Sequence, residues 1–247
     1  MIQHDFIYGN IINHDICDRL IDLFEETSDG DTPISLTNGW EGNMIKERGV
    51  VGRMKKEVSD GESLSTIDET RKMSTDLSVP HYADHPTVSQ YNQELSKIID
   101  QYCTIFPWVS SGCQEWGNAP WDAFNIQKYK PNEAFFTWHS ERTTLCKGVI
   151  CRYLVFMTYL NDVEDGGETE WFHQKLKIKP QKGLTVLWPP DWTYTHRGVA
   201  SPTETKYIAT GWFNFLPPED AIVEKPSDIK DKDGVYLTSN RDVFLPF

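Results

Sequence analysis

The feature that most constrains this chain is a series of short strand patterns between residues 122 and 215. Residues 123–129 alternate at a period of two, and residues 149–160 form a nearly continuous apolar run. Further strand patterns, separated by turns rich in glycine and proline, follow at residues 135–141, 167–172, 175–178, 183–188 and 206–215. Many short strands at this spacing are typical of a sandwich or barrel, and we expect a mainly β fold with flanking helices, a double-stranded β-helix (a cupin-like jelly roll).

The chain before this series is expected to support it. Residues 4–12 predict a strand, Asn13 offers a cap for a helix of about 15 residues, and residues 86–106 predict a second helix. Residues 27–80 are polar, and we expect one or two weak strands there, with residues 71–79 at the edge of the sheet. We expect one domain over residues 1–247, divided into supporting helices, strands and loops (1–121), the jelly-roll core (122–216) and a tail packed on the body (217–247).

The net charge of −13 and the pI of about 4.9 argue against proteins that bind nucleic acid or anionic membranes. No excess of Lys and Arg is present to neutralise phosphates, so we expect neither nucleic acid nor an anionic membrane as partner. The five cysteines show no paired spacing, and the first residues have neither the basic nor the apolar part of a signal peptide. No apolar run is long enough to cross a membrane, and we expect a cytoplasmic protein with free thiols.

Two histidines and a carboxylate within the strand series have the composition of a metal site. His139 and Glu141 stand two residues apart, which on a strand points both side chains to the same side. His196 follows several strands later, far enough along a jelly roll to return beside the first pair. Two imidazoles and one carboxylate on one face of an ion leave its other positions open, as in non-haem Fe(II) oxygenases. Lys206 lies ten residues further on (206 − 196), where it could hold the far carboxylate of an organic acid bound to the metal.

Two further motifs extend this pattern into a family resemblance. The segments Tyr-Leu-Asn-Asp-Val-Glu-Asp-Gly-Gly-Glu-Thr (159–169) and Lys-Tyr-Ile-Ala-Thr-Gly-Trp (206–212) resemble the prolyl 4-hydroxylase branch of the 2-oxoglutarate/Fe(II)-dependent dioxygenases. Arg152 stands seven residues before Tyr159 (159 − 152), as the family's arginine does. Tyr129 matches the family's tyrosine upstream of the first metal histidine, one residue further away than usual. The resemblance is specific over residues 122–215 and looser in the N-terminal strand and helix.

The resemblance implies a set of binding residues and a reaction. The metal ligands for Fe(II) would be His139, Glu141 and His196, and 2-oxoglutarate would be bound by Lys206, Tyr129 and Thr210. Arg152 and Trp212 would face the substrate. The implied reaction hydroxylates an unactivated C–H bond with O₂ as co-substrate, succinate and CO₂ as co-products and ascorbate as a reductant.

The implied substrate is a peptidyl proline, and the partner is therefore a proline-containing peptide or protein. Within enzymes, the alternative is a hydroxylase of a free amino acid or another small molecule. Outside enzymes, the alternative is a non-catalytic jelly-roll binding protein with a degenerate metal site, although the retained Lys206 argues against it.

The sequence departs from the family's pattern at three positions. Glu141 stands where Asp is usual, so the strand or the metal must shift to accommodate one more methylene. Other branches of the superfamily use this longer carboxylate, and we expect iron to bind. Phe136 stands where Tyr is usual and lacks a hydroxyl near the cofactor. Arg197 follows the second histidine where Gly is frequent, and it could reshape the mouth of the site.

Overall fold

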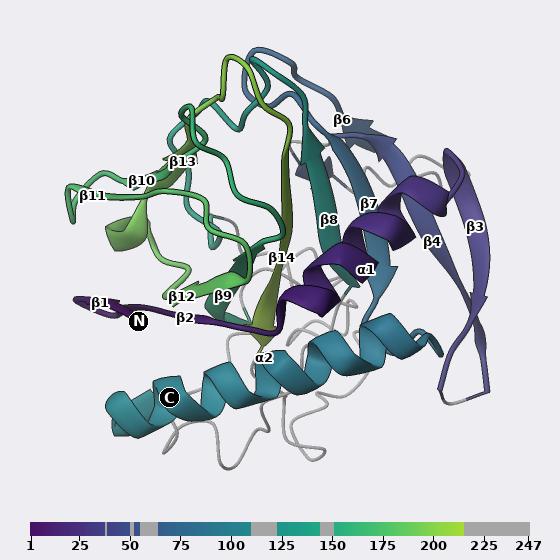
Figure 1. The fold of residues 1–247 in the computed structure, drawn as a ribbon, viewed down its shortest axis with the longest axis horizontal. Helices are drawn as coiled ribbons and strands as arrows, with labels where there is room; N and C mark the ends of the chain where they lie inside the picture. The colour runs from purple at the N-terminus through teal and green to yellow at the C-terminus, as the bar shows by residue number, and fades with distance from the viewer. Residues whose placement is uncertain (38, 50–51, 55–63, 110–122, 144–150, 215–247) are drawn as a thin grey trace, which may run out of the picture.

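The body of the fold is a nine-stranded antiparallel sheet (Figure 1). The computed structural model describes residues 1–37, 39–49, 52–54, 64–109, 123–143 and 151–214. The strands are, in spatial order, β1 (Ile2–His4), β2 (Ile7–Ile11), β12 (Leu184–Trp188), β9 (Arg152–Tyr159), β14 (Lys206–Asn214), β8 (Ala123–Tyr129), β7 (Thr75–Pro80), β4 (Glu41–Arg48) and β3 (Gly30–Ser35).

A smaller sheet covers one face of the large one. Its spatial order is β11 (Leu176–Ile178), β10 (Thr169–Trp171) and β13 (His196–Gly198), with a 3-10 turn (Trp192–Tyr194) before β13. Trp171 and Ile178 from the small sheet share a buried cluster with Val155 and Val186 from the large one. A separate pair consists of β5 (Gly52–Met54) and β6 (Leu64–Thr66). Two antiparallel sheets packed face to face around such a core confirm the predicted jelly-roll fold class.

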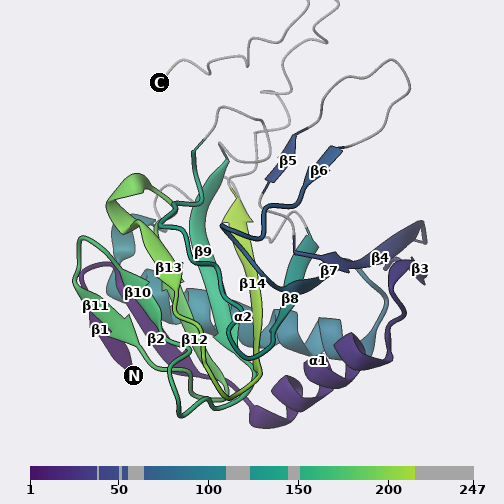
Figure 2. The same cartoon turned by 90° about the horizontal axis from the view of Figure 1, so that it is seen from above.

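Both long helices lie on the other face of the large sheet (Figures 1 and 2). They are α1 (His14–Glu26) and α2 (Pro86–Ile105). The predicted cap of α1 is confirmed, since the Asn13 side chain accepts a hydrogen bond from the Asp15 N–H. The apolar sides of the helices, including Leu20 and Tyr91, are buried in one cluster with Phe156 of β9. The helices therefore cover the outer face of the sheet and leave its inner face to the small sheet.

The alternation of side chains along β14 separates these two faces. Ala209 and Phe213 belong to the cluster on the helix side, whereas Ile208 and Trp212 pack with the cluster between the sheets. Because side chains alternate at a period of two, Lys206 shares the inner face with Ile208 and Trp212. The inner face of this central strand is thus where a bound ligand would meet the predicted lysine.

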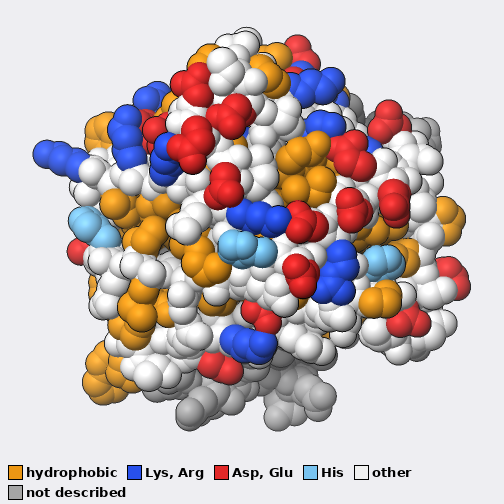
Figure 3. Space-filling view, in the orientation of Figure 1, with side chains coloured by type: hydrophobic (Ala, Val, Ile, Leu, Met, Phe, Trp, Pro, Cys, Tyr) orange, Lys and Arg blue, Asp and Glu red, His pale blue; other side chains and the backbone are white. Residues whose placement is uncertain are grey.

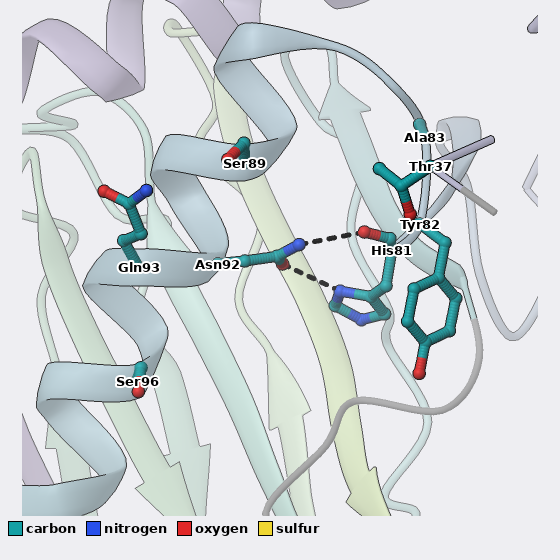
Figure 4. Close-up of a pocket in the computed structure, with 8 residues that line it drawn as sticks. All are labelled: Thr37, His81, Tyr82, Ala83, Ser89, Asn92, Gln93 and Ser96. Atoms are coloured by element: carbon teal, nitrogen blue, oxygen red, sulfur yellow. Dashed lines mark hydrogen bonds between the residues drawn. The ribbon is translucent and has the colours of Figure 1, made fainter. Parts of the chain in front are cut away.

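A buried histidine ties α2 to the helix side of the sheet. Asn92 donates a hydrogen bond to the carbonyl of His81 (2.9 Å), and its side-chain oxygen lies 3.0 Å from His81 Nδ1 (Figure 4). Burial lowers the pKa of His81 to about 4, which keeps the ring neutral. A hollow of about 370 Å³ opens beside this pair, lined also by Tyr82 and Ser89. His81 packs against Phe124 and Phe156 of the helix-side cluster, so the hollow is separated from the inner face by the sheet.

The N-terminal part differs from the prediction in three ways. The single strand predicted at residues 4–12 is a hairpin of β1 and β2, whose turn places Asp5 at φ 52°. The described residues between 27 and 80 form five strands (β3 to β7) rather than one or two. The segment 71–79 was predicted at the sheet edge, but β7 lies inside the sheet between β4 and β8. The predicted second helix is confirmed and ends at Ile105.

Some predictions lie beyond what the structure describes. The predicted docking of the tail (217–247) and the first residues of the apolar run at 149–160 fall outside the described residues. The domain boundaries remain predictions. Within the described part of the chain, no helix is both long and apolar enough to cross a membrane. On the face drawn in Figure 3, acidic and basic side chains are mixed with apolar ones.

Candidate active site

The two predicted histidines and Glu141 come together on the inner side of the jelly roll. Their ligand atoms all lie within 4.8 Å of one another. The Nε2 atoms of His139 and His196 each lie 3.5 Å from the same oxygen, Glu141 Oε1. The three donors therefore converge on one point, as three ligands on one face of a metal ion must.

The opposite nitrogen of each imidazole fixes which nitrogen can bind a metal. Nδ1 of His139 lies 2.9 Å from the carbonyl of Thr137, and Nδ1 of His196 lies 2.9 Å from that of Tyr194. Because a carbonyl oxygen can only accept, each Nδ1 carries the proton and donates it. A neutral ring then has its lone pair on Nε2, directed toward the carboxylate. Backbone carbonyls commonly orient metal-binding histidines in this way.

Backbone contacts, rather than a regular strand, position the first two donors. The strand predicted at residues 135–141 is wrong, since the structure has only isolated bridges there, including one between His139 and His196. The backbone N–H groups of Glu141 and Arg142 both donate to the carbonyl of Pro190 (3.0 Å each). His139 and Glu141 nevertheless point to the same side, as their spacing predicted.

The electrostatic environment of His139 and Glu141 favours the protonation states in which these two groups can bind a metal. Burial, followed by the neighbouring His196, lowers the pKa of His139, so this imidazole is neutral. Burial alone raises the pKa of a carboxyl, but the two facing imidazoles hold the pKa of Glu141 well below its usual range. Two imidazole nitrogens and one carboxylate oxygen are a donor set that suits Fe(II).

The second oxygen of Glu141 is held by the two residues predicted to face the substrate. Trp212 Nε1 donates to Glu141 Oε2 at 3.0 Å, and Arg152 Nη1 lies 3.7 Å from the same oxygen. Arg152 Nη1 also donates to the backbone carbonyl of Glu141 at 2.9 Å. The Arg152 guanidinium stacks 3.5 Å above the centre of the Trp212 ring.

A β-bulge explains how Arg152 reaches this position. Leu154 is paired with Phe213, yet Arg152 is paired with the next residue of β14, so Tyr153 is an extra residue in β9. Leu154 belongs to the cluster on the helix side. Because the bulge interrupts the alternation, Arg152 points instead to the inner side, where it meets Glu141.

Lys206 is a buried cation without a carboxylate partner in the described part of the chain. Only 4% of its surface is exposed. Its Nζ donates to the carbonyl of Gly167 at 2.9 Å and lies 5.0 Å from the centre of the Tyr129 ring. An ammonium has three donors, and a buried one without an anion is costly. A carboxylate of a bound ligand would satisfy it.

Tyr129 on β8, which was predicted to bind 2-oxoglutarate, belongs to a row of hydrogen-bonded, buried polar side chains. Its hydroxyl donates to the side-chain oxygen of Gln127 at 2.6 Å, and the Gln127 amide donates to Asp76 at 3.3 Å. Asp76 is paired with the buried Lys72 at 2.5 Å. Burial, and then the charge of Asp76, raise the pKa of Tyr129 well above its usual range, so the hydroxyl stays protonated. Tyr129 can accept a hydrogen bond from Lys206 or a ligand while this donor bond persists.

Thr210 lies on β14 between Lys206 and Trp212. Its hydroxyl donates to the carbonyl of Phe156 at 2.9 Å, which fixes the hydroxyl proton within the sheet. The oxygen of Thr210 is left as an acceptor. Its predicted contact with 2-oxoglutarate stays a prediction.

The sequence did not single out the residues that support this site. Arg142 makes a bidentate pair with Asp191 (2.7 and 2.8 Å), which fastens the segment after Glu141 to the segment before His196. Asn161 donates to the carbonyl of Thr205 and accepts from the backbone N–H of the residue after Lys206. The motif at 159–169 contains Asn161, so its role in placing the lysine could have been suspected from that motif alone.

The three donors fit Fe(II), and the buried Lys206 fits a carboxylate of 2-oxoglutarate. Comparisons with known proteins agree with both. Residues 124–214 match the family model described as the 2OG-Fe(II) oxygenase superfamily. The match covers 91 of the 247 residues, and over this segment the chain is similar to that superfamily. The matched segment contains all three donors and Lys206. The predicted cofactors, Fe(II) and 2-oxoglutarate, are those of this superfamily.

Solved structures of prolyl hydroxylases share the fold. A viral collagen prolyl hydroxylase from Paramecium bursaria Chlorella virus-1, in complex with 2OG, is 15% identical, with a TM-score of 0.53 over 86% of this chain and 97% of that one. A prolyl-4-hydroxylase from Pseudomonas putida is 14% identical, with a TM-score of 0.54 over 86% and 94%.

A third solved structure is a prolyl hydroxylase from Trichoplax adhaerens in complex with a peptide fragment of the hypoxia inducible factor oxygen degradation domain. It is 12% identical, with a TM-score of 0.54 over 89% of this chain and 86% of that one. No curated protein matches the chain by sequence. The superfamily match agrees with the predicted 2-oxoglutarate/Fe(II) dioxygenase, and the solved structures show that its fold is shared with prolyl hydroxylases.

Proposed function

We propose that this chain is a 2-oxoglutarate/Fe(II) dioxygenase that hydroxylates a proline within a peptide or protein. His139, Glu141 and His196 hold the iron, and Lys206 pairs with the far carboxylate of 2-oxoglutarate. The observation that carries the proposal is the pairing of a three-donor site with a buried, unneutralised lysine on the same inner face. Neither feature is needed for a jelly roll to fold, and the lysine is costly without a ligand anion.

The bound groups supply the oxidation itself. Iron and 2-oxoglutarate provide the chemistry in which O₂ hydroxylates a C–H bond while 2-oxoglutarate is converted to succinate and CO₂. The chain's residues bind and orient. Lys206 fixes one end of the dicarboxylate, Thr137 and Tyr194 orient the two imidazoles through their carbonyls, and Trp171 and Trp188 exclude water beside His196.

The substrate class rests on the shared fold and on one complex. Prolyl hydroxylases from a virus, a bacterium and an animal match this chain over most of its length, and the animal one holds a peptide. The cysteines show no paired spacing in the sequence, and the cytoplasm stays the proposed location.

The enzyme should form succinate from 2-oxoglutarate only when Fe(II), O₂ and a suitable peptide are all present. A library of proline-containing peptides is incubated with the protein, and mass spectrometry reports products heavier by one oxygen atom. Free proline and other amino acids are tested in parallel. Oxygen incorporation into free amino acids alone would overturn the peptide assignment, and an absence of both turnover and iron binding would overturn the enzyme assignment.

The affinity for 2-oxoglutarate should fall as the pH rises above about 8. Burial lowers the pKa of Lys206 from its usual range to about 8 in the ligand-free chain. Below this pH the side chain is already an ammonium, whereas above it the amine must take up a proton to pair with the carboxylate. Each further pH unit then weakens binding by up to about tenfold.

Calorimetric titration with 2-oxoglutarate, using Mn(II) in place of iron, measures this pH dependence. Lys206→Arg is the matched control, because a guanidinium stays charged throughout and should remove the dependence on pH. A wild-type affinity that does not change between about pH 7 and 9.5 would contradict the assignment of Lys206 as the ammonium that pairs with the ligand.

A further inference from the structure

We propose that Trp212 and Arg152 are positioning residues that hold the second oxygen of Glu141, so that its first oxygen stays aimed at the metal. The inference rests on the proposed function, because it takes Glu141 as a metal ligand. This role in metal binding is distinct from any contact that the two residues make with the substrate.

The two oxygens of the Glu141 carboxylate have different contacts. Oε1 faces both imidazoles at 3.5 Å, while Oε2 accepts the Trp212 N–H at 3.0 Å and has the Arg152 guanidinium 3.7 Å away. A carboxylate held in this way cannot rotate to present both oxygens to the ion. Metal-binding carboxylates are commonly fixed by such hydrogen bonds from outside the ligand set.

The supporting residues are themselves fixed. The Arg152 guanidinium stacks on the Trp212 ring at 3.5 Å and donates to the backbone carbonyl of Glu141 at 2.9 Å. The Arg152 guanidinium thus contacts both the side chain and the backbone of Glu141. The bulge at Tyr153 exists at the point where β9 must turn this arginine inward.

The length of the glutamate makes this support specific. An aspartate at the same position would be shorter by one carbon–carbon bond, about 1.5 Å. With the backbone unmoved, its carboxylate could not keep both the Trp212 hydrogen bond and the approach to the two histidines. The longer side chain has one more rotatable bond, and fixing that bond is the task that the indole N–H performs.

Metal binding by the metal-free chain of 247 residues tests the inference. Co(II) is titrated into wild type, Trp212→Phe and Arg152→Gln without 2-oxoglutarate, and the visible Co(II) spectrum gives both Kd and ligand geometry. Trp212→Phe keeps a ring for the guanidinium but removes the N–H. We expect Co(II) binding about 10- to 100-fold weaker in both variants, with an altered spectrum. The exposed Trp192 provides the matched control, Trp192→Phe, which should bind like wild type.

A double-mutant cycle with Glu141→Asp separates positioning from general packing. In the Glu141→Asp background, Trp212→Phe should change the Co(II) Kd less than about twofold, because the hydrogen bond is already lost. Equal effects of Trp212→Phe in both backgrounds would overturn the inference. Thermal unfolding of the metal-free variants checks that they fold, and Arg152→Gln carries the test should Trp212→Phe unfold.

Glu141→Ala distinguishes this inference from the proposed function. If Glu141→Ala weakens Co(II) binding while Trp212→Phe and Arg152→Gln leave it unchanged and only raise KM for the peptide, the two residues contact substrate and the positioning role is wrong. If Glu141→Ala itself leaves Co(II) binding unchanged, the metal site is wrong and the inference fails with it.

Discussion

Replacing Lys206 by methionine should weaken 2-oxoglutarate binding by at least about 100-fold and, at neutral pH, stabilise the ligand-free chain. Both effects come from one buried charge. The ammonium contacts the Gly167 carbonyl and no described carboxylate. We therefore expect the carboxylate of a bound ligand to neutralise it. Methionine has a similar length and no charge to desolvate.

The stability gain has a sign and a pH window. Burial lowers the pKa of Lys206 to about 8, whereas in the unfolded chain a lysine titrates near its usual value of 10.5. Below pH 8 the folded state therefore pays the full cost of the buried charge, about 3 kcal/mol for a shift of this size. Between the two pKa values wild-type stability rises with pH, because the unfolded state binds more protons. Above pH 10.5 both states are neutral and the advantage of Lys206→Met disappears.

Denaturant unfolding across this pH range and calorimetric titration with 2-oxoglutarate measure the two effects. Lys179→Met is the control, since Lys179 is half exposed and pairs with Glu164 at the surface. It should change neither quantity by more than about 0.5 kcal/mol. An unchanged affinity for 2-oxoglutarate in Lys206→Met would contradict the carboxylate assignment. A destabilised Lys206→Met would contradict the cost assigned to the buried ammonium.

The core of the fold was predictable because its strands are buried on both faces. All residues of β12 and nearly all of β9 are buried, which gives apolar runs that a sequence reveals. The strands β3 and β4 lie at the far edge of the sheet, where most side chains remain exposed or half-exposed. They show no apolar alternation, so the sequence predicted too few strands before residue 80.

The candidate site was predictable in its ligands and less so in its supports. His139, Glu141, His196 and Lys206 stand out because their residue types and spacing match a known donor set. The position of Arg152 could not be obtained by counting, since alternation from Leu154 would place it on the helix side. The extra residue, Tyr153, places Arg152 on the inner side instead. No local sequence pattern indicates such a bulge.

The chain of Lys72, Asp76 and Gln127 was missed for a different reason. The first two residues lie in the segment 71–79, which the sequence placed at the edge of the sheet, and Gln127 lies in a strand where a polar residue on one face is ordinary. Only the pairing of β7 with β8 brings Asp76 opposite Gln127. Contacts set by strand register depend on which strands pair, and a single sequence does not state that.

Replacing His139 by alanine should remove the metal and with it all 2-oxoglutarate turnover. The three donors lie within 4.8 Å of one another, and the chain supplies no fourth His, Cys, Asp or Glu to the group among the described residues. Two donors cannot form the face that three provide, so the loss should exceed the about 10- to 100-fold that follows from removing an outer-shell partner. The fold should survive, because the backbone bridge between residues 139 and 196 does not depend on the imidazole.

Metal content after dialysis, Co(II) affinity and succinate formation measure the effect of His139→Ala. His173→Ala is the control, because His173 is exposed and its ring lies beside the rings of Phe172 and Trp192. This control should retain wild-type metal content and turnover. A His139→Ala protein that still binds one metal ion and forms succinate would show that the ion sits elsewhere. The convergence of His139, Glu141 and His196 would then be a packing arrangement, and the role of Lys206 would need a different ligand.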